Sequence, residues 1–257
     1  MKVAIIADIH GNSIALNNVL NDIQSQGGVD ETWFLGDYAA IGFDPIGVLE
    51  SITSLPNTRF LRGNTDRYVE SGDMPWPEIA DIKKEPELAQ LHIQVARSFS
   101  WTTGAVGATG WLPWFRELKL DFRVNLLDGS KVLAVHASPG TDDGMGININ
   151  TSYHELRQLV SDAGANLIFV AHTHIPFDRS VQGIRVVNPG SVSNPFPPDL
   201  RASYGLLEVD KSGHTITHRR VDYDRNAVVK AMSGLNHPSA EYVKKFMSGN
   251  VRKDWMK

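Results

Sequence analysis

Residue types that bind divalent metals recur at five places along the chain, each directly after a short apolar run. Two of these places hold pairs spaced by one residue, D-x-H near the amino terminus and H-x-H further on. The residues concerned are Asp8, His10, Asp37, Asn64, His136, His172 and His174. The chain has no cysteine, so a metal would have to use these nitrogen and oxygen donors rather than thiolates.

The size of this set predicts two metal ions rather than one. Four histidines, two aspartates and one asparagine exceed the four ligands of a tetrahedral site. They suit two ions about 3.5–4 Å apart, which need one bridging carboxylate. Glycines at positions 11, 36 and 63 let the backbone turn sharply close to the ions. Both spaced pairs point their two side chains the same way if strand geometry persists.

Strands have to position these residues, and the sequence predicts six of them. Each run is rich in Val, Ile, Leu or Phe and stops at a polar or glycine-rich segment. The runs are 2–7, 32–35, 58–61, 131–135, 167–170 and 185–187. Amphipathic segments at 13–25 and 152–164 predict helices, with Gly164 as the stop of the second. Alternating strands and helices indicate an α/β fold, with functional side chains past the carboxyl ends of the strands.

The remaining segments depart from this alternation. Residues 70–118 have a helical pattern and four tryptophans, which predicts a helical insertion or cap beside the site. The alternative is a core-facing helical pair without a ligand role. Segments 202–210 and 214–224 alternate like antiparallel strands, and 225–257 predicts closing helices.

The composition is that of an ordinary globular chain. Its 257 residues are 42% apolar and 21% charged, and the formal net charge of -4 argues against general nucleic-acid binding. The first ten residues, MKVAIIADIH, hold an apolar run too short for a signal peptide or a membrane span. Together with the lack of cysteine, this favours a cytoplasmic protein with no membrane partner.

The order of the motifs resembles a known family. D-x-H, G-D, G-N-x-D, H and H-x-H, with VNPGSVSNP at 187–195, are similar to the calcineurin-like metallophosphoesterase superfamily and its small bacterial and archaeal phosphodiesterase-like branch. The resemblance covers most of the chain. It implies an α/β fold in which two mixed β-sheets are sandwiched between helices. We expect a single domain, 1–257, with the insertion at about 70–118.

The resemblance also distributes the ligands between the ions. Asp8, His10 and His174 would bind one ion, and Asp37 would bridge both. Asn64, His136 and His172 would bind the other ion. Manganese is the first choice of metal, with iron, zinc or nickel as alternatives.

One position departs from the family pattern. Many members have a histidine that assists catalysis where this chain has Thr65, and a threonine hydroxyl cannot donate a proton near neutral pH. This predicts a substrate with a good leaving group, or a proton from water or another residue such as His92.

The predicted function is hydrolysis of a small phosphate ester, with a phosphodiester preferred, by attack of a metal-bridging hydroxide. The alternatives are a phosphomonoesterase, a protein or nucleotide phosphatase, and a non-catalytic metal-binding scaffold on the same fold. Asp37 and Asn64 are candidate catalytic residues. Asn12 is a third candidate catalytic residue, with capping of the helix that follows as the alternative role. Arg67 is a fourth candidate, which would bind the substrate phosphate, with a solvated surface charge as the alternative. Asp66 is expected to orient its loop. The oligomeric state is not predicted.

Overall fold

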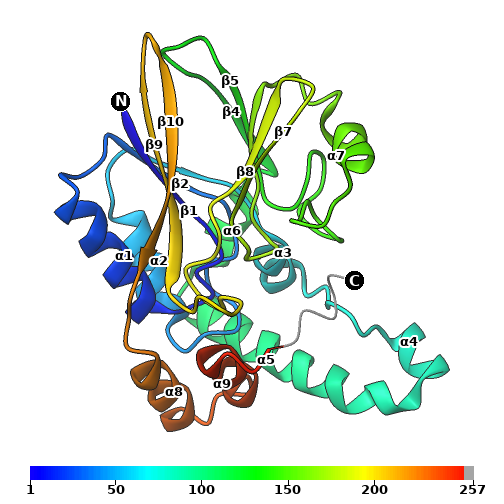
Figure 1. Cartoon of the computed structure of the whole chain (residues 1–257). Coiled ribbons are helices and arrows are strands. Elements are labelled where there is room, and N and C mark those ends of the chain that lie inside the picture. Colours follow the sequence, from blue (N-terminus) through cyan, green and yellow to red (C-terminus); the bar gives the residue numbers. More distant parts are fainter. Residues whose placement is uncertain (252–257) are drawn as a thin grey trace.

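Two mixed five-stranded sheets pack face to face, with helices along their outer sides (Figure 1). The computed structural model describes residues 1–251. This arrangement is the sandwich that the family resemblance implied, so the predicted fold class is confirmed.

The first sheet has the order β10-β9-β1-β2-β3. Its strands are β1 (Lys2–Ile6), β2 (Glu31–Phe34), β3 (Thr58–Phe60), β9 (Ala202–Asp210) and β10 (Gly213–Val221). β1, β2 and β3 run parallel, whereas β9 is antiparallel to β1 and β10 is antiparallel to β9.

The second sheet has the order β4-β5-β6-β8-β7. Its strands are β4 (Asp121–Asn125), β5 (Lys131–Val135), β6 (Leu167–Phe169), β7 (Phe177–Val181) and β8 (Ile184–Asn188). β5, β6 and β8 run parallel, and an antiparallel strand borders them on each side. Each sheet therefore has three parallel strands, whose carboxyl ends can present side chains at one edge.

All six predicted runs form strands, with ends that shift by one residue in most of them. Two strands, β4 and β7, were not predicted. Both are edge strands with charged residues and an alternating burial pattern, so they lack the continuous apolar run that marks a buried strand. The predicted antiparallel pair at 202–210 and 214–224 is β9 and β10.

Ten helical segments complete the described chain. They are α1 (Ser13–Ser25), α2 (Pro45–Thr53), α3 (Asn64–Ser71), α4 (Ile79–Lys84), η1 (Pro86–Leu88), α5 (Ala89–Ala108), α6 (Leu112–Glu117), α7 (Tyr153–Val160), α8 (Arg225–Gly234) and α9 (Ala240–Ser248). The first helix has the predicted bounds. The second predicted helix, 152–164, is shorter than expected, because α7 ends at Val160 and Gly164 follows in a separate left-handed turn.

The sheets are held together by an apolar layer between them. Trp33 of β2 is fully buried in this layer, and its ring meets Phe122 of β4 and Phe169 of β6 edge-on at 5.5 and 6.0 Å between centroids. Since the two partners belong to the opposite sheet, Trp33 fixes how the parallel strand ends of one sheet face those of the other.

The segment between α3 and β4 is helical, and only part of it reaches the core. Phe99 and Val106 of α5 and Phe115 of α6 are buried against the first sheet's helical layer. α4 and residues 89–97 of α5 extend away from the sheets and include no buried residue (Figure 1). The segment is therefore helical, as expected, with one part packed on the core and one part that projects from it; its role as a cap beside the site stays a prediction.

The carboxyl-terminal part forms α8 and α9, which pack together around Val228, Met232 and Phe246. The end of the predicted closing segment, 252–257, lies outside the described residues. No helix within residues 1–251 is both long and apolar enough to cross a membrane.

We predict that Trp33→Ala lowers the free energy of unfolding by roughly 3–5 kcal/mol, because it opens a cavity between the sheets. Thermal and urea unfolding measure the effect, and the melting temperature is expected to fall by roughly 2–4 °C for each kcal/mol. Trp76→Ala is the matched control. Trp76 is 60% exposed, so its removal is expected to change stability by less than about 0.5 kcal/mol. Equal losses in the two variants would contradict this role of Trp33.

Candidate metal centre

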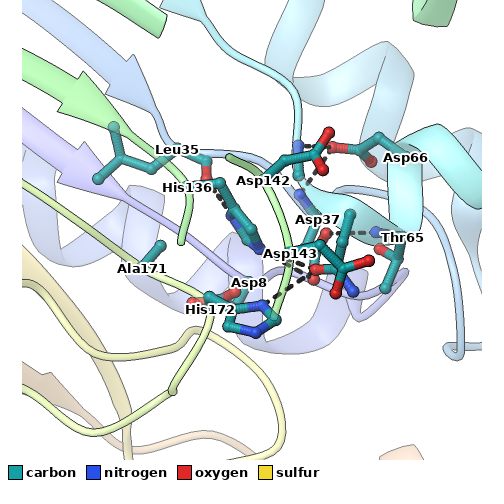
Figure 2. A network of polar contacts seen from close by, with 12 residues as sticks. Asp8, Leu35, Asp37, Thr65, Asp66, His136, Asp142, Asp143, Ala171 and His172 are labelled. Carbon is teal, nitrogen blue, oxygen red and sulfur yellow. Dashed lines mark hydrogen bonds and ion pairs between the residues drawn. The ribbon is translucent and has the colours of Figure 1, made fainter. Parts of the chain in front are cut away.

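The seven candidate ligands come together at the carboxyl ends of the parallel strands. Asp8 and His10 follow β1, Asp37 follows β2, and Asn64 follows β3. The second sheet contributes His136 after β5 and His172 and His174 after β6. Figure 2 shows Asp8, Asp37, His136 and His172 turned toward one another from different loops.

One group of ligand atoms surrounds Asp8. The carboxylate of Asp8 and the imidazoles of His10 and His174 offer atoms that all lie within 4.8 Å of one another. The two Nε2 atoms of His10 and His174 are 3.2 Å apart, and Nε2 of His174 lies 3.7 Å from Oδ1 of Asp8. These are the three residues expected to share one ion.

A second group surrounds Asn64. Its Oδ1 lies 3.1 Å from Nε2 of His136 and 3.1 Å from Nδ1 of His172. These are the residues expected to share the other ion.

Asp37 lies between the two groups. Its Oδ2 is 3.7 Å from Nε2 of His10 and 3.5 Å from Nε2 of His136, so one carboxylate reaches a member of each group. This is the position that a bridging ligand requires.

Backbone carbonyls orient all four imidazoles. Nδ1 of His10 lies 3.2 Å from the oxygen of Ala40, and Nδ1 of His174 lies 3.0 Å from the oxygen of Asn194. Nδ1 of His136 lies 2.6 Å from the oxygen of Leu35, whereas His172 uses Nε2, at 2.9 Å from the oxygen of Gly144. A ring nitrogen that faces a carbonyl oxygen carries the proton, so the other nitrogen of each neutral ring presents a lone pair to the centre.

The Asp8 carboxylate is the clearest sign that a cation belongs here. The side chain is fully buried, and neither oxygen meets a hydrogen-bond donor in good geometry within residues 1–251. Burial raises the pKa of Asp8 well above its usual value and outweighs the lowering by His136 and by the nearby backbone amide of His172. A buried carboxylate without donors is costly unless a positive charge compensates it. The donor set of carboxylates, imidazoles and one amide therefore fits divalent metals of the manganese, iron, nickel and zinc kind.

The electrostatics of the centre favour positive charge at its middle. Burial lowers the pKa values of His10, His172 and His174, the last to about 3, so these rings are neutral ligands at pH 7. His136 differs, because Asp37 outweighs burial and raises its pKa to about 10. Burial acts to raise the pKa of Asp37, but His136 holds it well below its usual range. The position between Asp37 and His136 thus attracts a proton or a metal ion.

The backbone at the ligands is strained. Five of the seven residues have a left-handed backbone, with φ of 55° at Asp8, 48° at His10, 61° at Asp37, 65° at His172 and 60° at His174. Each such residue costs roughly 1–3 kcal/mol when it is not glycine. Strand geometry does not persist through the spaced pairs, because β1 ends at Ile6 and β6 at Phe169 and residues with a left-handed backbone follow. The turns place His172 and His174 in different groups.

Two glycines permit the close approach of the loops. A Cβ atom on Gly63 would lie 2.1 Å from Oδ1 of Asp37, and one on Gly36 would lie 2.4 Å from the backbone nitrogen of Gly63. Any side chain at either position would push the loops after β2 and β3 apart. Glycine is therefore required where Asp37 meets Asn64.

Asp66 ties the same two loops together, as the sequence analysis expected. It accepts hydrogen bonds from the backbone nitrogens of Asp37, Tyr38 and Gly63 at 2.8, 2.9 and 2.8 Å. Three donors satisfy this buried carboxylate, in contrast to that of Asp8.

One candidate catalytic residue, Asn12, and one suggested proton donor, His92, make other contacts. Asn12 caps α1 by accepting from the backbone nitrogen of Ala15 at 3.0 Å and donates to the hydroxyl of Ser193 at 3.2 Å. Its capping role, one of the two alternatives, is the one that the structure supports. His92 bonds the oxygen of Pro77 and does not line the hollow over the ligand cluster, so the geometry gives no support to it as a proton donor.

The guanidinium of Arg67 is paired with three aspartates rather than free for phosphate. Its nitrogens lie 3.2 Å from Asp142, 3.1 Å from Asp73 and 2.7 Å from Asp143, and it stacks on Tyr68. The Tyr68 hydroxyl also donates to Asp143, whose neighbour Gly144 holds His172. Arg67 therefore supports the loop behind the second ligand group.

Sequence reasoning missed one residue that holds the H-x-H turn in place. Asn188, at the end of β8, is fully buried and donates to the oxygen of Ala171 at 2.8 Å and to the hydroxyl of Thr173 at 3.1 Å. Its own oxygen accepts from the nitrogen of Gly190. The motif at 187–195 contains Asn188 and was the only signal for it.

Comparisons with known proteins agree with the geometry. Residues 1–212 match the model of the calcineurin-like phosphoesterase superfamily domain. An uncharacterized protein of Methanocaldococcus jannaschii is 30% identical over 237 residues, which are 86% of this chain and 88% of that protein. The crystal structure of a metallophosphoesterase from Sphaerobacter thermophilus has a TM-score of 0.75 at 25% identity, over 98% of this chain and 100% of that one. A hypothetical protein from Pyrococcus horikoshii OT3 shares the fold, with a TM-score of 0.78 at 22% identity over 95% and 97% of the two chains.

We predict opposite effects for two buried aspartates when each is changed to asparagine. Asp8→Asn removes a charge that has no donor, so in chelator its melting temperature should be no lower than that of the wild type. Its stabilisation by added Mn²⁺ should be smaller, because a ligand is lost. Asp66→Asn puts an amide where three backbone donors converge, so it should lose roughly 1–3 kcal/mol with or without metal. A lower stability of Asp8→Asn in chelator would contradict the assignment of Asp8 as a cation-dependent carboxylate.

Proposed function

This chain belongs to the calcineurin-like phosphoesterase superfamily, and on that basis we propose that it hydrolyses a phosphodiester with two divalent metal ions. The observation that carries the proposal is the position of Asp37 between two groups of ligand atoms that face each other. Asp8, His10 and His174 would hold one ion and Asn64, His136 and His172 the other, with Asp37 shared. When bound, the ions would supply Lewis-acid activation of water and neutralise the phosphoryl oxygens.

A hollow over the ligand cluster has room for the phosphate group. It measures about 280 Å³ and is lined by His10, Asp37, Asn64, His172 and His174, among others. No lysine or arginine lines it within the described part of the chain. With Arg67 paired elsewhere, no described residue adds a cationic side chain to bind a second negative charge. This supports a singly charged diester rather than a doubly charged monoester.

The leaving-group side of the hollow lacks a strong acid. Thr65 lines the hollow next to Asn64, and its backbone nitrogen donates to Oδ1 of Asp37 at 3.0 Å. Its hydroxyl is buried and neither donates nor accepts a hydrogen bond within residues 1–251. A threonine hydroxyl does not release a proton near neutral pH, so the protein's contribution is to hold the ligands and exclude bulk water. Esters with good leaving groups suit this arrangement.

We predict that chelated protein is inactive and that Mn²⁺ restores hydrolysis of bis-p-nitrophenyl phosphate more than that of p-nitrophenyl phosphate. Asp37→Asn should lower both the metal content and the diesterase kcat/KM, the latter by roughly 100-fold or more, since losses of outer contacts alone reach 10–100-fold. Asp162→Asn, at an exposed aspartate, is the control. Full activity in Asp37→Asn would contradict the bridging role. Turnover of the monoester alone would identify a phosphatase, and two bound ions without turnover of either ester would favour a scaffold.

A second variant tests the missing acid. Thr65→His puts an imidazole beside the hollow, and its ordinary pKa near 6.5 allows it to donate a proton at neutral pH. We expect faster hydrolysis of diesters with poor leaving groups, up to the 10²–10⁴-fold that general acids provide. The pH profile should also gain a descending alkaline limb. Thr65→Val, which cannot donate, should show neither change. Equal rates for the two variants across leaving groups would contradict the argument.

A further inference from the structure

A second, separate cavity opens beside the ligand cluster. It measures about 330 Å³ and lies between α3, α5 and α9, where Figure 1 shows α5 and α9 next to each other. Hydroxyl groups of Ser98 on α5 and Ser239 just before α9 are hydrogen-bonded, which joins these two walls. The cavity is thus lined by α3, the helical segment at 70–118, the carboxyl-terminal helices and Ile41 of the loop after β2, and by no strand residue.

The cavity shares a wall with the hollow over the ligand cluster. Ile41, Asn64, Thr65 and Tyr242 line both spaces. Asn64 is one of the candidate ligands, so the cavity lies directly beside the place where a phosphate would contact the cluster. The buried Thr65 hydroxyl, which no described residue satisfies, is part of that shared wall.

The lining of the cavity is aromatic, apolar and uncharged. Trp76, Phe99, Tyr68 and Tyr242 contribute rings, and among residues 1–251 no Asp, Glu, Lys or Arg lines it. Gln94 and the serine pair supply neutral polar groups. Such a site favours an uncharged aromatic group with a few hydrogen-bonding atoms over a sugar phosphate, a lipid chain or a charged peptide.

The rim of the cavity exposes rings that a folded chain ordinarily covers. Trp76 is 60% exposed and Tyr242 is 46% exposed, and both line the cavity. Exposed rings beside a concave site are typical of a binding surface, and flat rings stack on nucleobases regardless of sequence.

We propose that this cavity binds the organic arm of the phosphate ester and that this arm carries an uncharged aromatic ring of nucleobase size. The substrate class is then a nucleoside phosphodiester or a similar aryl ester. The inference rests on the proposed function for the position of the phosphate. A volume near 330 Å³ lies at the lower end of the roughly 300–1,000 Å³ of ligand pockets, which suits one nucleoside and not a longer polymer.

The test uses two neighbouring positions of α5. Gln94 lines the cavity, whereas Ile93 is 54% exposed and does not. Gln94→Trp fills the cavity, and Ile93→Trp adds the same bulk outside it. Calorimetric titration with adenosine measures the binding affinity of the cavity without catalysis, since adenosine has no phosphate to hydrolyse. Hydrolysis of thymidine 5′-(p-nitrophenyl phosphate) by the Mn²⁺-loaded proteins measures its effect on turnover.

We expect adenosine to bind the wild type and Ile93→Trp alike and to bind Gln94→Trp at least about tenfold more weakly, by loss of the space for the base. KM for the thymidine ester should rise in Gln94→Trp and stay within about twofold in Ile93→Trp, with equal metal content in all three proteins. Trp76→Ala should weaken adenosine binding by roughly 5- to 100-fold through lost stacking. Ile79→Ala is its control, because Ile79 is similarly exposed but does not line the cavity.

Two results would overturn the inference. One is no adenosine binding to the wild type, and the other is equal binding and equal KM in Gln94→Trp and Ile93→Trp. Its failure can be told from failure of the proposed function. If adenosine binding depends on Gln94 and Trp76 but no ester is hydrolysed with both ions bound, the cavity assignment stands and the phosphodiesterase assignment falls.

Discussion

The architecture depends on one electrostatic constraint, the burial of the Asp8 and Asp37 carboxylates among imidazole nitrogens that face inward. Such a cluster is costly unless positive charge lies at its centre. The surroundings keep it from relaxing. Backbone carbonyl oxygens orient each imidazole, and Asp66 joins two loops by accepting hydrogen bonds from their backbone amides. The apolar layer around Trp33 fixes the position of one sheet relative to the other. The strain in five left-handed ligand residues persists because these contacts determine the loops.

Residue type and position after an apolar run were enough to pick out, from the sequence, seven side chains that the structure brings together. A parallel strand that is buried on both faces has a continuous apolar run, which makes β1, β2, β5 and β6 recognisable in the sequence. The polar residues that follow each run are the candidate ligands. β4 and β7 did not, because an edge strand with one solvated face carries charges. The partners of Arg67 were also beyond sequence reasoning. Asp142 and Asp143 lie 75 and 76 residues away and meet it only through the packing of two loops.

The carbonyl oxygens that orient the imidazoles leave no trace in the sequence, since every residue type has one. Ala40, Leu35 and Gly144 serve by where their backbone lies and not by their side chains. Similarly, the helical pattern of 70–118 indicated α5 but not its division into a buried half with Phe99 and an exposed half with Leu91. That division decides which residues are left to line a cavity, and it follows from how far the helix extends past the sheets.

The short path from Tyr68 to His172 has a thermodynamic consequence. Tyr68 forms part of the cavity wall, its hydroxyl donates to Asp143, and the next residue's carbonyl holds the ring of His172. A molecule that contacts Tyr68 in the cavity and an ion that contacts His172 would therefore both act on the loop at 142–144. Linkage makes any such influence symmetrical: the factor by which an occupant of the cavity alters the affinity for the ion equals the factor by which the ion alters the affinity for the occupant. The affinity for an ion and the affinity for an occupant of the cavity would then share one coupling factor, transmitted through the loop at 142–144.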